Sequence, residues 1–372
     1  MNEIIDNKDT SVLLNWWLNI DKSLLISFFV LSFFGLVISF TIKPGSSLVD
    51  EVSIFNAFTI QSAYLVMGIN IFILISFIDL KNLKKYAPLL YIVLFILLLA
   101  TIIPSFGIEK KGSSRWLDFT FITLMPVELI KPIFCIILAL TLENKIDKIN
   151  SKKYFYSFIL YILVALILIK QPDIGQLVIV SAIFISSFFL SGFSFPILII
   201  IIVLGFISFI GIYFFNSNVE YRVNSFLSPE QYDISQATRS ISAFIEGGFF
   251  GVGQGEGKLK NDLQESHTDY IFAVIAEEYG VIGCLIILFL FFYIAYRSFR
   301  RAYNEKDHFV QLCLFSLTVY LSLQTLVHAA VNLRLIPSTG MTLPFISYGG
   351  SSILGISFTL GLMLLLTKKS HN

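Results

Sequence analysis

The side chains best suited to chemistry stand together at residues 265–269, which read Glu-Ser-His-Thr-Asp and precede an apolar run that opens at Tyr270. The cluster puts two carboxylates and an imidazole where an apolar helix would enter a membrane. Partial desolvation at such a boundary raises the pKa of a carboxylate toward the working pH, as general-base catalysis requires. A charged residue beside a membrane helix is more often an interfacial anchor, so the cluster alone leaves both roles open.

A second group of charges, Lys110, Lys111 and Arg115, belongs to the sequence Lys-Lys-Gly-Ser-Ser-Arg-Trp of residues 110–116. It falls in a connection predicted to lie outside the cell membrane, where short loops normally carry few cations. A ligand with a pyrophosphate group would explain it through charge-assisted hydrogen bonds. Attraction to anionic lipid headgroups explains it equally well. Further candidates on the same side are Arg222, Arg239 and Arg334.

Ionisable and strongly polar side chains inside apolar runs are costly in a bilayer, so each of them is a candidate for function. Glu128 and Lys131 are three residues apart, share a helix face and can form an ion pair. The remaining members of this set are Asp173, Glu277, Glu278, His328 and Asn332. Such charges also suit a transporter whose binding site lies at the membrane midplane.

Two stretches rich in glycine or proline indicate irregular backbone. Glycine recurs through residues 247–257 without the βαβ context of a nucleotide-binding loop, which favours a tight loop over a cleft. Residues 343–352 contain a proline and paired glycines at the entry to the last apolar run. Irregular backbone is tolerated at membrane depth only where it is buried in protein or lines a polar cavity. We therefore expect a polar cavity that opens near Asp269.

The elements that must position these groups are membrane helices. Of 372 residues, 56% are hydrophobic and only 14% are charged, whereas soluble domains carry about 25% charged residues. A bilayer core of about 30 Å needs about 20 apolar residues per helix. Such runs occur at 22–42, 54–78, 86–105, 119–142, 155–170, 173–191, 195–215, 270–296, 308–333 and 343–366. We predict an all-α polytopic membrane protein of ten transmembrane helices, with a long extracytoplasmic loop at 216–269 between spans seven and eight.

The orientation follows from the lysines and arginines of the short connections, most of which fall on one side if both termini are cytoplasmic. On this basis residues 1–21 form an N-terminal cytoplasmic tail, 22–366 a single transmembrane domain, and 367–372 a C-terminal cytoplasmic tail. The net charge of +1, dispersed among the loops, indicates no nucleic-acid partner. The cysteines lie inside apolar runs without metal-site spacing, so no metal site is predicted, although a divalent cation is not excluded.

Several of these stretches together resemble the SEDS family of cell-shape and division proteins, which includes FtsW and RodA. Residues 343–352, Leu-Pro-Phe-Ile-Ser-Tyr-Gly-Gly-Ser-Ser, are similar to the signature of that family, and residues 265–278 match a second block. Further matches are residues 111–116, the Pro126/Glu128/Lys131 pattern, residues 171–175, and the glycine stretch with Gln236 before it. The matches follow the order of the family through most of the chain.

The resemblance implies an inverting peptidoglycan glycosyltransferase that polymerises lipid II at the outer face of the bacterial cytoplasmic membrane. Asp269 matches the catalytic aspartate of the family and would deprotonate the acceptor hydroxyl that attacks the donor sugar. Lys111, Arg115 and Arg239 would stabilise the departing pyrophosphate. Further implied substrate contacts are Glu265, His267 and Ser347. Implied structural or cleft-lining residues are Glu128, Lys131, Asp173, Gln236, Glu277, Glu278, Asn332, Pro344, Gly349 and Gly350.

The family also implies partners, namely a class B penicillin-binding protein and other divisome membrane proteins, and no certain cofactor. Thr342 and residues 335–340 look more like FtsW, which acts at the division septum, than like RodA, which acts in elongation. The chain departs from the family pattern at Gln264 and Tyr270, and Asp262 stands where some relatives carry a glutamate. These departures put activation by a partner in doubt.

Two other functions stay open, a lipid II flippase and a non-catalytic scaffold. A polymerase needs its indispensable charge at the outer boundary, at Asp269. Alternating access instead needs a midplane site between structural repeats, and the sequence contains no convincing repeat. A scaffold would keep its function after the substitution Asp269→Ala.

Overall fold

The computed structural model describes residues 12–40, 54–110, 113–119, 123–143, 151–228, 235–263 and 265–368. Its helices are α1 (Val12–Asn19), α2 (Lys22–Ser39), α3 (Ile54–Phe77), α4 (Leu80–Ala100), α5 (Pro126–Leu142), α6 (Ser151–Lys170), α7 (Ile174–Leu190), α8 (Phe195–Phe215), α9 (Ser217–Leu227), α10 (Ser235–Gly247), α11 (Ile271–Tyr303), α12 (His308–Asn332) and α13 (Gly350–Leu366). A 3-10 turn, η2, spans Leu259–Asn261, and the strands are β1 (Gly107–Lys110), β2 (Ser113–Asp118) and β3 (Thr123–Leu124).

The predicted class, a helical membrane protein, is confirmed, and a helix coincides with each of the ten apolar ranges. Seven of the described helices are long and apolar enough to cross a membrane, namely α2, α3, α4, α6, α8, α11 and α12. The helices α5, α7 and α13 have 17 residues each, at the lower limit of about 17–25 residues for a bilayer span. The count of ten spans therefore stays a prediction.

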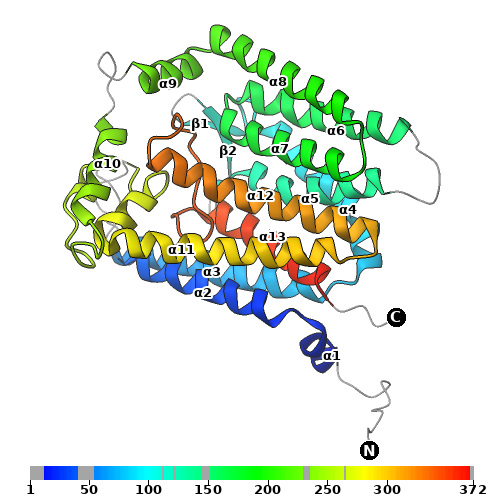
Figure 1. The fold of residues 1–372 in the computed structure, drawn as a ribbon, viewed down its shortest axis with the longest axis horizontal. Coiled ribbons are helices and arrows are strands. Elements are labelled where there is room, and N and C mark those ends of the chain that lie inside the picture. The colour runs from blue at the N-terminus through cyan, green and yellow to red at the C-terminus, as the bar shows by residue number, and fades with distance from the viewer. Residues whose placement is uncertain are drawn as a thin grey trace, which may run out of the picture.

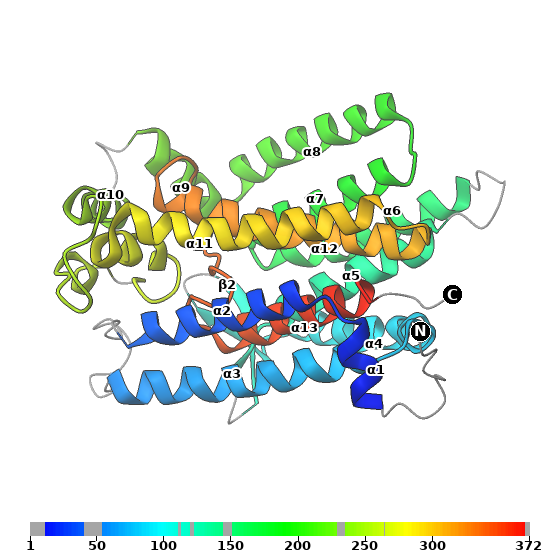
Figure 2. The same cartoon turned by 60° about the horizontal axis from the view of Figure 1, so that its bottom comes forward.

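The long helices run along a common direction, with α11 beside α12 and α13 packed against α3 (Figures 1 and 2). The short helix α5 contacts α4, α6, α7, α12 and α13, so the charged residues on it lie in the interior of the bundle. The main contacts of α8 are with its sequence neighbours α7 and α9, and Figure 2 shows it at the edge of the molecule. The interior around α5 is therefore the part of the fold that can hold a polar site.

The connection between α4 and α5 contains a small sheet, and the fourth helix starts later than predicted. There, β1, β2 and β3 form an antiparallel sheet, and Thr123 and Leu124 of β3, predicted to be in the fourth span, precede the helix. Burial alternates along β2, with Ser113, Arg115 and Leu117 buried, as the period-two geometry of a strand requires. The helix begins at Pro126, whose fixed φ and missing N–H suit a first helical position. The sheet thus turns Arg115 toward the interior.

The last predicted span is shorter than expected, because residues 343–349 are not helical. Phe345 has a φ of 63°, in the left-handed region that residues other than glycine rarely adopt. Its carbonyl group lies so close to Gly35 of α2 that a Cβ on Gly35 would overlap with it. The helix α13 starts only at Gly350, which lies against the ring of Tyr64. The irregular entry that the proline and the paired glycines predicted is therefore present.

The predicted eighth span is not one straight helix. Gly280 interrupts α11 with a φ of 68° and a ψ of −172°. The Sγ atom of Cys284 lies 3.8 Å from the carbonyl oxygen of Phe272, which is 12 residues earlier. Twelve residues of straight helix span about 18 Å, so the chain folds back at Gly280. Residues 271–279 form a short limb that packs on the long limb, 281–303.

Glu277 and Glu278, predicted to lie inside the eighth span, stand beside this turn and hold the chain that follows the glycine-rich residues 247–257. The Glu277 carboxylate accepts hydrogen bonds from the N–H groups of Leu259 (2.8 Å) and Lys260 (3.0 Å). Glu278 forms an ion pair with Lys260. Both carboxylates are buried, so they fasten the chain around η2 to the end of the short limb.

The substitution Gly280→Ala is expected to lower the free energy of unfolding by at least about 1–3 kcal/mol, since its backbone conformation is essentially restricted to glycine. A Cβ at this position would also overlap with the carbonyl oxygen of Phe249 and the amide nitrogen of Gly251. The matched control is Gly255→Ala, because Gly255 has a φ of +84° and nothing within 4 Å of the added Cβ. Thermal unfolding in detergent compares the two variants, and equal midpoints would contradict the fold-back at Gly280.

Candidate functional site

Asp269 lies immediately before α11, at a position set by Asn332 in the last turn of α12. The Asn332 side chain is 0% exposed, donates to the carbonyl oxygen of Asp269 (2.9 Å) and accepts from the N–H of Ala273 (3.0 Å). The Ala273 N–H also reaches the carbonyl oxygen of Tyr270 (3.0 Å), so Asn332 adds a second acceptor to the first turn of α11 and fixes the Asp269 backbone at the same time. The Asp269 side chain itself is half-buried.

The side chains of Asp269 and Arg115 both lie beside Gly340. It belongs to residues 333–349, which join α12 to α13 and are called the strap below. A Cβ on Gly340 would lie 3.2 Å from Nη1 of Arg115 and 3.8 Å from Oδ2 of Asp269. The guanidinium and the carboxylate therefore face the same point of the strap backbone, and a glycine is required there to leave room between them.

The substitution Gly340→Ala is expected to reduce activity about tenfold or more, because a displacement of reacting groups by about 1 Å can cost as much as 10²-fold. The matched control is Gly192→Ala. Both glycines have positive φ values, +72° and +80°, but nothing lies within 4 Å of a Cβ on Gly192. The two variants should thus lose similar stability to backbone strain, about 1–2 kcal/mol. Equal activities of the two variants would show that the space beside Gly340 has no functional role.

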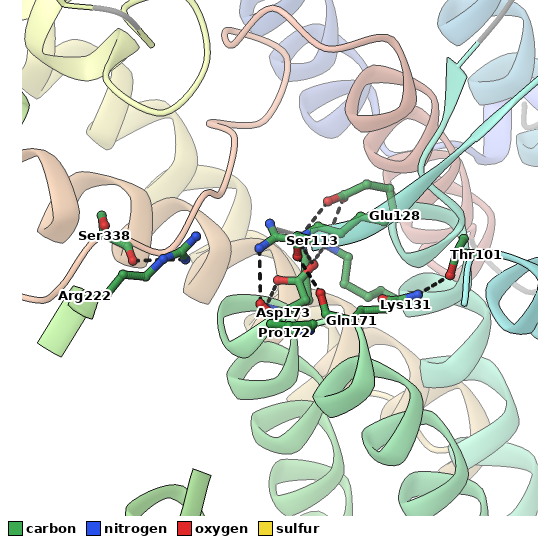
Figure 3. Close-up of polar contacts among 11 residues, drawn as sticks. Thr101, Ser113, Glu128, Lys131, Gln171, Pro172, Asp173, Arg222 and Ser338 are labelled. Atoms are coloured by element: carbon green, nitrogen blue, oxygen red, sulfur yellow. Dashed lines mark hydrogen bonds and ion pairs between the residues drawn. The ribbon is translucent and has the colours of Figure 1, made fainter. Parts of the chain in front are cut away.

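Arg115 is held in place by groups on β2 and by the break between α6 and α7. Its Nε atom forms an ion pair with Asp173 Oδ2 (3.2 Å) and donates to Ser113 Oγ (2.8 Å). Its Nη2 atom donates to the carbonyl oxygen of Pro172 (3.4 Å), and Ser113 donates to that of Gln171 (2.5 Å). Figure 3 shows Ser113, Gln171, Pro172 and Asp173 gathered at this break. One edge of the guanidinium is thereby occupied, and Nη1 is directed to the strap.

A buried network around Lys131 lies behind Arg115. Lys131 is 0% exposed and pairs with Glu128 Oε2 at 2.9 Å, which confirms that the two residues share a face. It also donates to the side-chain oxygens of Gln176 (2.8 Å) and Gln324 (3.1 Å). Its ammonium group lies 4.7 Å from the ring centroid of Tyr320, within the range of a cation–π interaction. The charge of Lys131 is thus surrounded by protein groups.

The two glutamines extend this network to both halves of the site. The backbone N–H of Gln176 donates to Asp173 Oδ1 (3.3 Å), and Asp173 in turn holds Arg115. The Gln324 side chain donates to the carbonyl oxygen of Thr342 in the strap (3.2 Å). In Figure 3, Lys131 and Asp173 lie in the same polar cluster. Lys131 is therefore connected to the Arg115 side and to the strap side of the site.

Arg222, which the sequence indicated only as one further cation, also belongs to this site. It is carried by α9, and its Nη1 donates to the carbonyl oxygen of Ser338 in the strap (3.4 Å; Figure 3). Burial lowers the pKa of its guanidinium, and the positive charge of Arg115 acts in the same direction, whereas Asp173 and Asp269 oppose them. An arginine stays protonated despite such shifts. The site therefore contains two guanidinium groups close to the Asp269 carboxylate.

Of three other residues predicted to bind substrate, His267 and Ser347 tie residues 265–269 to the strap, and Glu265 has a contact within the segment. The Thr268 hydroxyl donates to Glu265 Oε2 (2.8 Å), and the Tyr348 N–H donates to the His267 carbonyl oxygen (2.8 Å). The Ser347 hydroxyl donates to the Thr268 carbonyl oxygen (2.8 Å). His267 and Ser347 are buried, so their visible contribution is to hold the chain on either side of Asp269.

The remaining predicted cations have different positions. Arg239, on the same helix α10 as Gln236, donates to the carbonyl oxygen of Asp262. Its neighbour Ser240 donates to the carbonyl oxygen of Asn332 (2.7 Å), which packs α10 against the end of α12. Lys111 lies outside the described residues. Of Arg115 and Arg239, the two described cations predicted to meet the pyrophosphate, Arg115 lies beside Asp269.

Sequence reasoning did not single out Gly340, Gln176 or Gln324. The two glutamines carry the same signal as Glu128, a polar side chain in an apolar run, and could have been found by it. Gly340 gives no such signal, because its importance depends on two side chains from distant segments. Among the described residues, no group of three or more His, Cys, Asp or Glu side chains is arranged to hold a metal ion.

The apolar helices and the charged site at one end of the bundle define a polytopic membrane protein with polar chemistry beside its membrane-crossing segments. A family model described as cell cycle protein, covering FtsW, RodA and SpoVE, matches residues 21–372. The chain belongs to this family.

Relatives and solved structures agree with this assignment. The chain is 33% identical over 365 residues to a probable peptidoglycan glycosyltransferase FtsW of Caulobacter vibrioides, covering 97% of this chain and 92% of the relative. It is 36% identical over 297 residues to the FtsW of the same description from Trichlorobacter lovleyi, covering 77% of each chain. A chain from a structure on coordinated polymerization and crosslinking by a peptidoglycan synthase complex superimposes with a TM-score of 0.78 at 25% identity, covering 94% of this chain and 98% of that one. The rod shape determining protein RodA of Thermus thermophilus shares the fold, with a TM-score of 0.69 at 24% identity and coverage of 94% and 97%.

Proposed function

We propose that this protein is a peptidoglycan glycosyltransferase of the FtsW type, which polymerises lipid II during cell division. The observation that carries the proposal is the half-buried Asp269 carboxylate, which faces Gly340 together with Arg115. A base and a fixed cation on one patch of backbone are what transfer of a sugar from a pyrophosphate requires. Relatives with coverage of most of the chain bear the same description.

In this reaction Asp269 acts as the general base. The Asp269 carboxylate takes the proton of the acceptor sugar 4-hydroxyl, whose oxygen forms a bond to the anomeric carbon of the donor. The bond from that carbon to the pyrophosphate oxygen breaks, and the lipid pyrophosphate leaves with the electron pair from the opposite face, so the anomeric centre inverts. A positioned general base typically contributes about 10²–10⁴-fold to such a rate.

The leaving pyrophosphate needs positive charge, and the two arginines of the site have different capacities to supply it. The Nε atom of Arg115 is paired with Asp173, so part of its charge is already balanced. Arg222 is only partly buried and bonds to a neutral carbonyl group of the strap. We therefore assign Arg222 the larger share of the contact with the pyrophosphate, with Arg115 as the fixed cation next to the base.

The substitution Arg222→Gln is expected to lower kcat/KM for lipid II by about 10²-fold, the usual scale for loss of a group that stabilises developing charge. Arg239→Gln should have a smaller effect, because its guanidinium is held at the Asp262 carbonyl group. Arg300→Gln, at the far end of α11 and exposed, serves as the matched control. Steady-state polymerisation rates distinguish the three variants. A larger loss for Arg239→Gln than for Arg222→Gln would assign the contact with the pyrophosphate to Arg239 of α10.

The proposed setting follows from the family and the charge distribution. Both termini would be cytoplasmic, and the site would open at the outer face of the bacterial cytoplasmic membrane, at the division septum. A class B penicillin-binding protein would be the partner, in agreement with the similarity to a chain of a peptidoglycan synthase complex. The RodA role in elongation is the alternative within the same chemistry.

A flippase is the second candidate, because buried charges on α5 suit a transport site. The contacts of Lys131 argue against it, since the ammonium group already has Glu128, Gln176 and Gln324 as partners. Release of these contacts for a passing headgroup would leave charges buried without partners, at a cost of several kcal/mol each. Asp269, by contrast, is half-buried and lies at the end of the bundle, where a substrate can reach it.

The test uses purified protein with its transpeptidase partner and lipid II. Formation of glycan strands, seen by gel electrophoresis, supports the polymerase. In parallel, vesicles that contain the protein and fluorescent lipid II report translocation through the loss of protection from a membrane-impermeant quencher. Translocation without strands would establish the flippase and overturn the proposal. The absence of both translocation and strands would also overturn it and would favour the scaffold.

A further inference from the structure

The helix α1, far from the site, presents an apolar face that the proposed function does not explain. At 100° per residue, Leu13, Leu14, Trp17 and Leu18 fall on one side of the helix. These side chains are 66%, 45%, 46% and 56% exposed. Residues 12–19 contain no charged side chain. An apolar face of this width in water would be unfavourable.

The opposite side of α1 is polar, and Trp16, between the polar and the apolar side, attaches the helix to the bundle. Asn15 and Asn19 lie on the polar side, and the Asn19 side chain donates to the Asn15 carbonyl oxygen (2.9 Å). Between the two sides, Trp16 stacks on Phe77 of α3 at a centroid distance of 4.8 Å and donates its indole N–H to Ser76 Oγ (3.0 Å). The rotation of α1 about its own axis is therefore fixed, and the apolar face points away from the bundle.

The position of α1 matches a membrane surface. It lies at the end of the bundle where α13 ends, and in Figure 2 it runs across the direction of α2 and α3. The adjoining spans also carry exposed apolar side chains, including Ile26 of α2 (61%) and Leu74 of α3 (65%). The Lys22 ammonium group lies 5.1 Å from the Trp17 ring centroid. Tryptophan beside lysine is typical of the membrane–water interface.

We propose that α1 is an interfacial helix that lies in the surface of the lipid bilayer, with the leucines and Trp17 inserted among the acyl chains and the asparagines toward water. Amphipathic helices of low charge bind membranes in this way, and their attachment scales with buried apolar area. Residues 12–19 are then not part of a cytoplasmic tail, and the lipid surface is the partner of this face. Through Trp16 the helix fixes the depth of α3 in the bilayer.

Site-directed spin labelling tests this in the full-length protein in vesicles. Nitroxides are introduced by Leu13→Cys and Leu18→Cys on the apolar face, and by Asn15→Cys and Asn19→Cys as matched controls on the other. The native cysteines are buried, so labelling is directed to the introduced thiols. The collision rates of each nitroxide with molecular oxygen and with a water-soluble nickel chelate are then compared.

The expected result is a ratio of oxygen to nickel collisions at least about fivefold higher at the leucine positions than at the asparagine positions, because oxygen concentrates among acyl chains. A high nickel rate at all four positions would place α1 in water and overturn the proposal. Low rates for both reagents at the leucine positions would show that protein covers the face, either residues 1–11 or a second copy, which also overturns it. The labels report the helix position itself, so a failure of polymerase activity has no bearing on the outcome.

Discussion

Asp269→Asn is expected to reduce lipid II polymerisation by about 10²–10⁴-fold, the contribution of a positioned general base. Asparagine has nearly the same shape as aspartate but cannot accept a proton from the acceptor hydroxyl. Asn332 holds the backbone carbonyl group of Asp269, and the substitution keeps this contact, so the start of α11 should stay in place. The loss should appear in kcat, with little change in thermal stability.

Asp262→Asn is the matched control for this prediction. Asp262 is an exposed carboxylate seven positions before Asp269 in the chain, and Arg239 donates to its backbone carbonyl oxygen. The same change of charge there should leave the polymerisation rate within about threefold, as for most exposed charges. Strand formation by Asp269→Asn at a rate close to that of Asp262→Asn would remove the general base from the proposed mechanism.

Lys131→Met is expected to lower the free energy of unfolding by about 3–5 kcal/mol, the usual cost of breaking a buried ion pair from one side. The variant leaves Glu128 at 2% exposure with a negative charge and no ammonium partner. It also removes the donor that holds Gln176 and Gln324. Thermal or denaturant unfolding in detergent measures the loss.

The double variant Glu128→Gln/Lys131→Met separates charge from position. It removes both charges, so it should recover much of the stability lost in Lys131→Met, since a buried pair replaced as a whole is often nearly neutral. It should not recover full polymerase activity, because the side chains of Gln176 and Gln324 lose the ammonium group that positions them.

Lys84→Met provides the matched control for the charge pair. Lys84 pairs with Glu143 at 3.0 Å, but their side chains are 31% and 20% exposed. Such partly solvated pairs contribute about 0–1 kcal/mol. Equal destabilisation by Lys84→Met and Lys131→Met would contradict the importance assigned to the buried network.

The positions of the apolar helices could be predicted from the sequence, because a bilayer imposes the same requirement of length and apolarity on every span. The boundaries were predicted less well where the backbone is irregular. Residues 119–125 are apolar enough to extend the predicted fourth span, yet Thr123 and Leu124 form strand β3 and the helix starts only at Pro126. Hydropathy measures the polarity of a segment and does not distinguish a short strand from the first turn of a helix.

The sequence by itself determined that this is a helical membrane protein and that Asp269 stands at the end of an apolar segment with other reactive groups. Hydrophobic runs and the order of motifs are properties of the sequence, so they can be read without knowledge of the fold. Only the tertiary structure decided which cations meet that carboxylate, because Arg115, Arg222 and Gly340 come from a strand, a helix and the strap that are far apart in the chain. It also decided that Gly280 reverses α11, since a single glycine in an apolar run does not reveal the direction in which the chain continues.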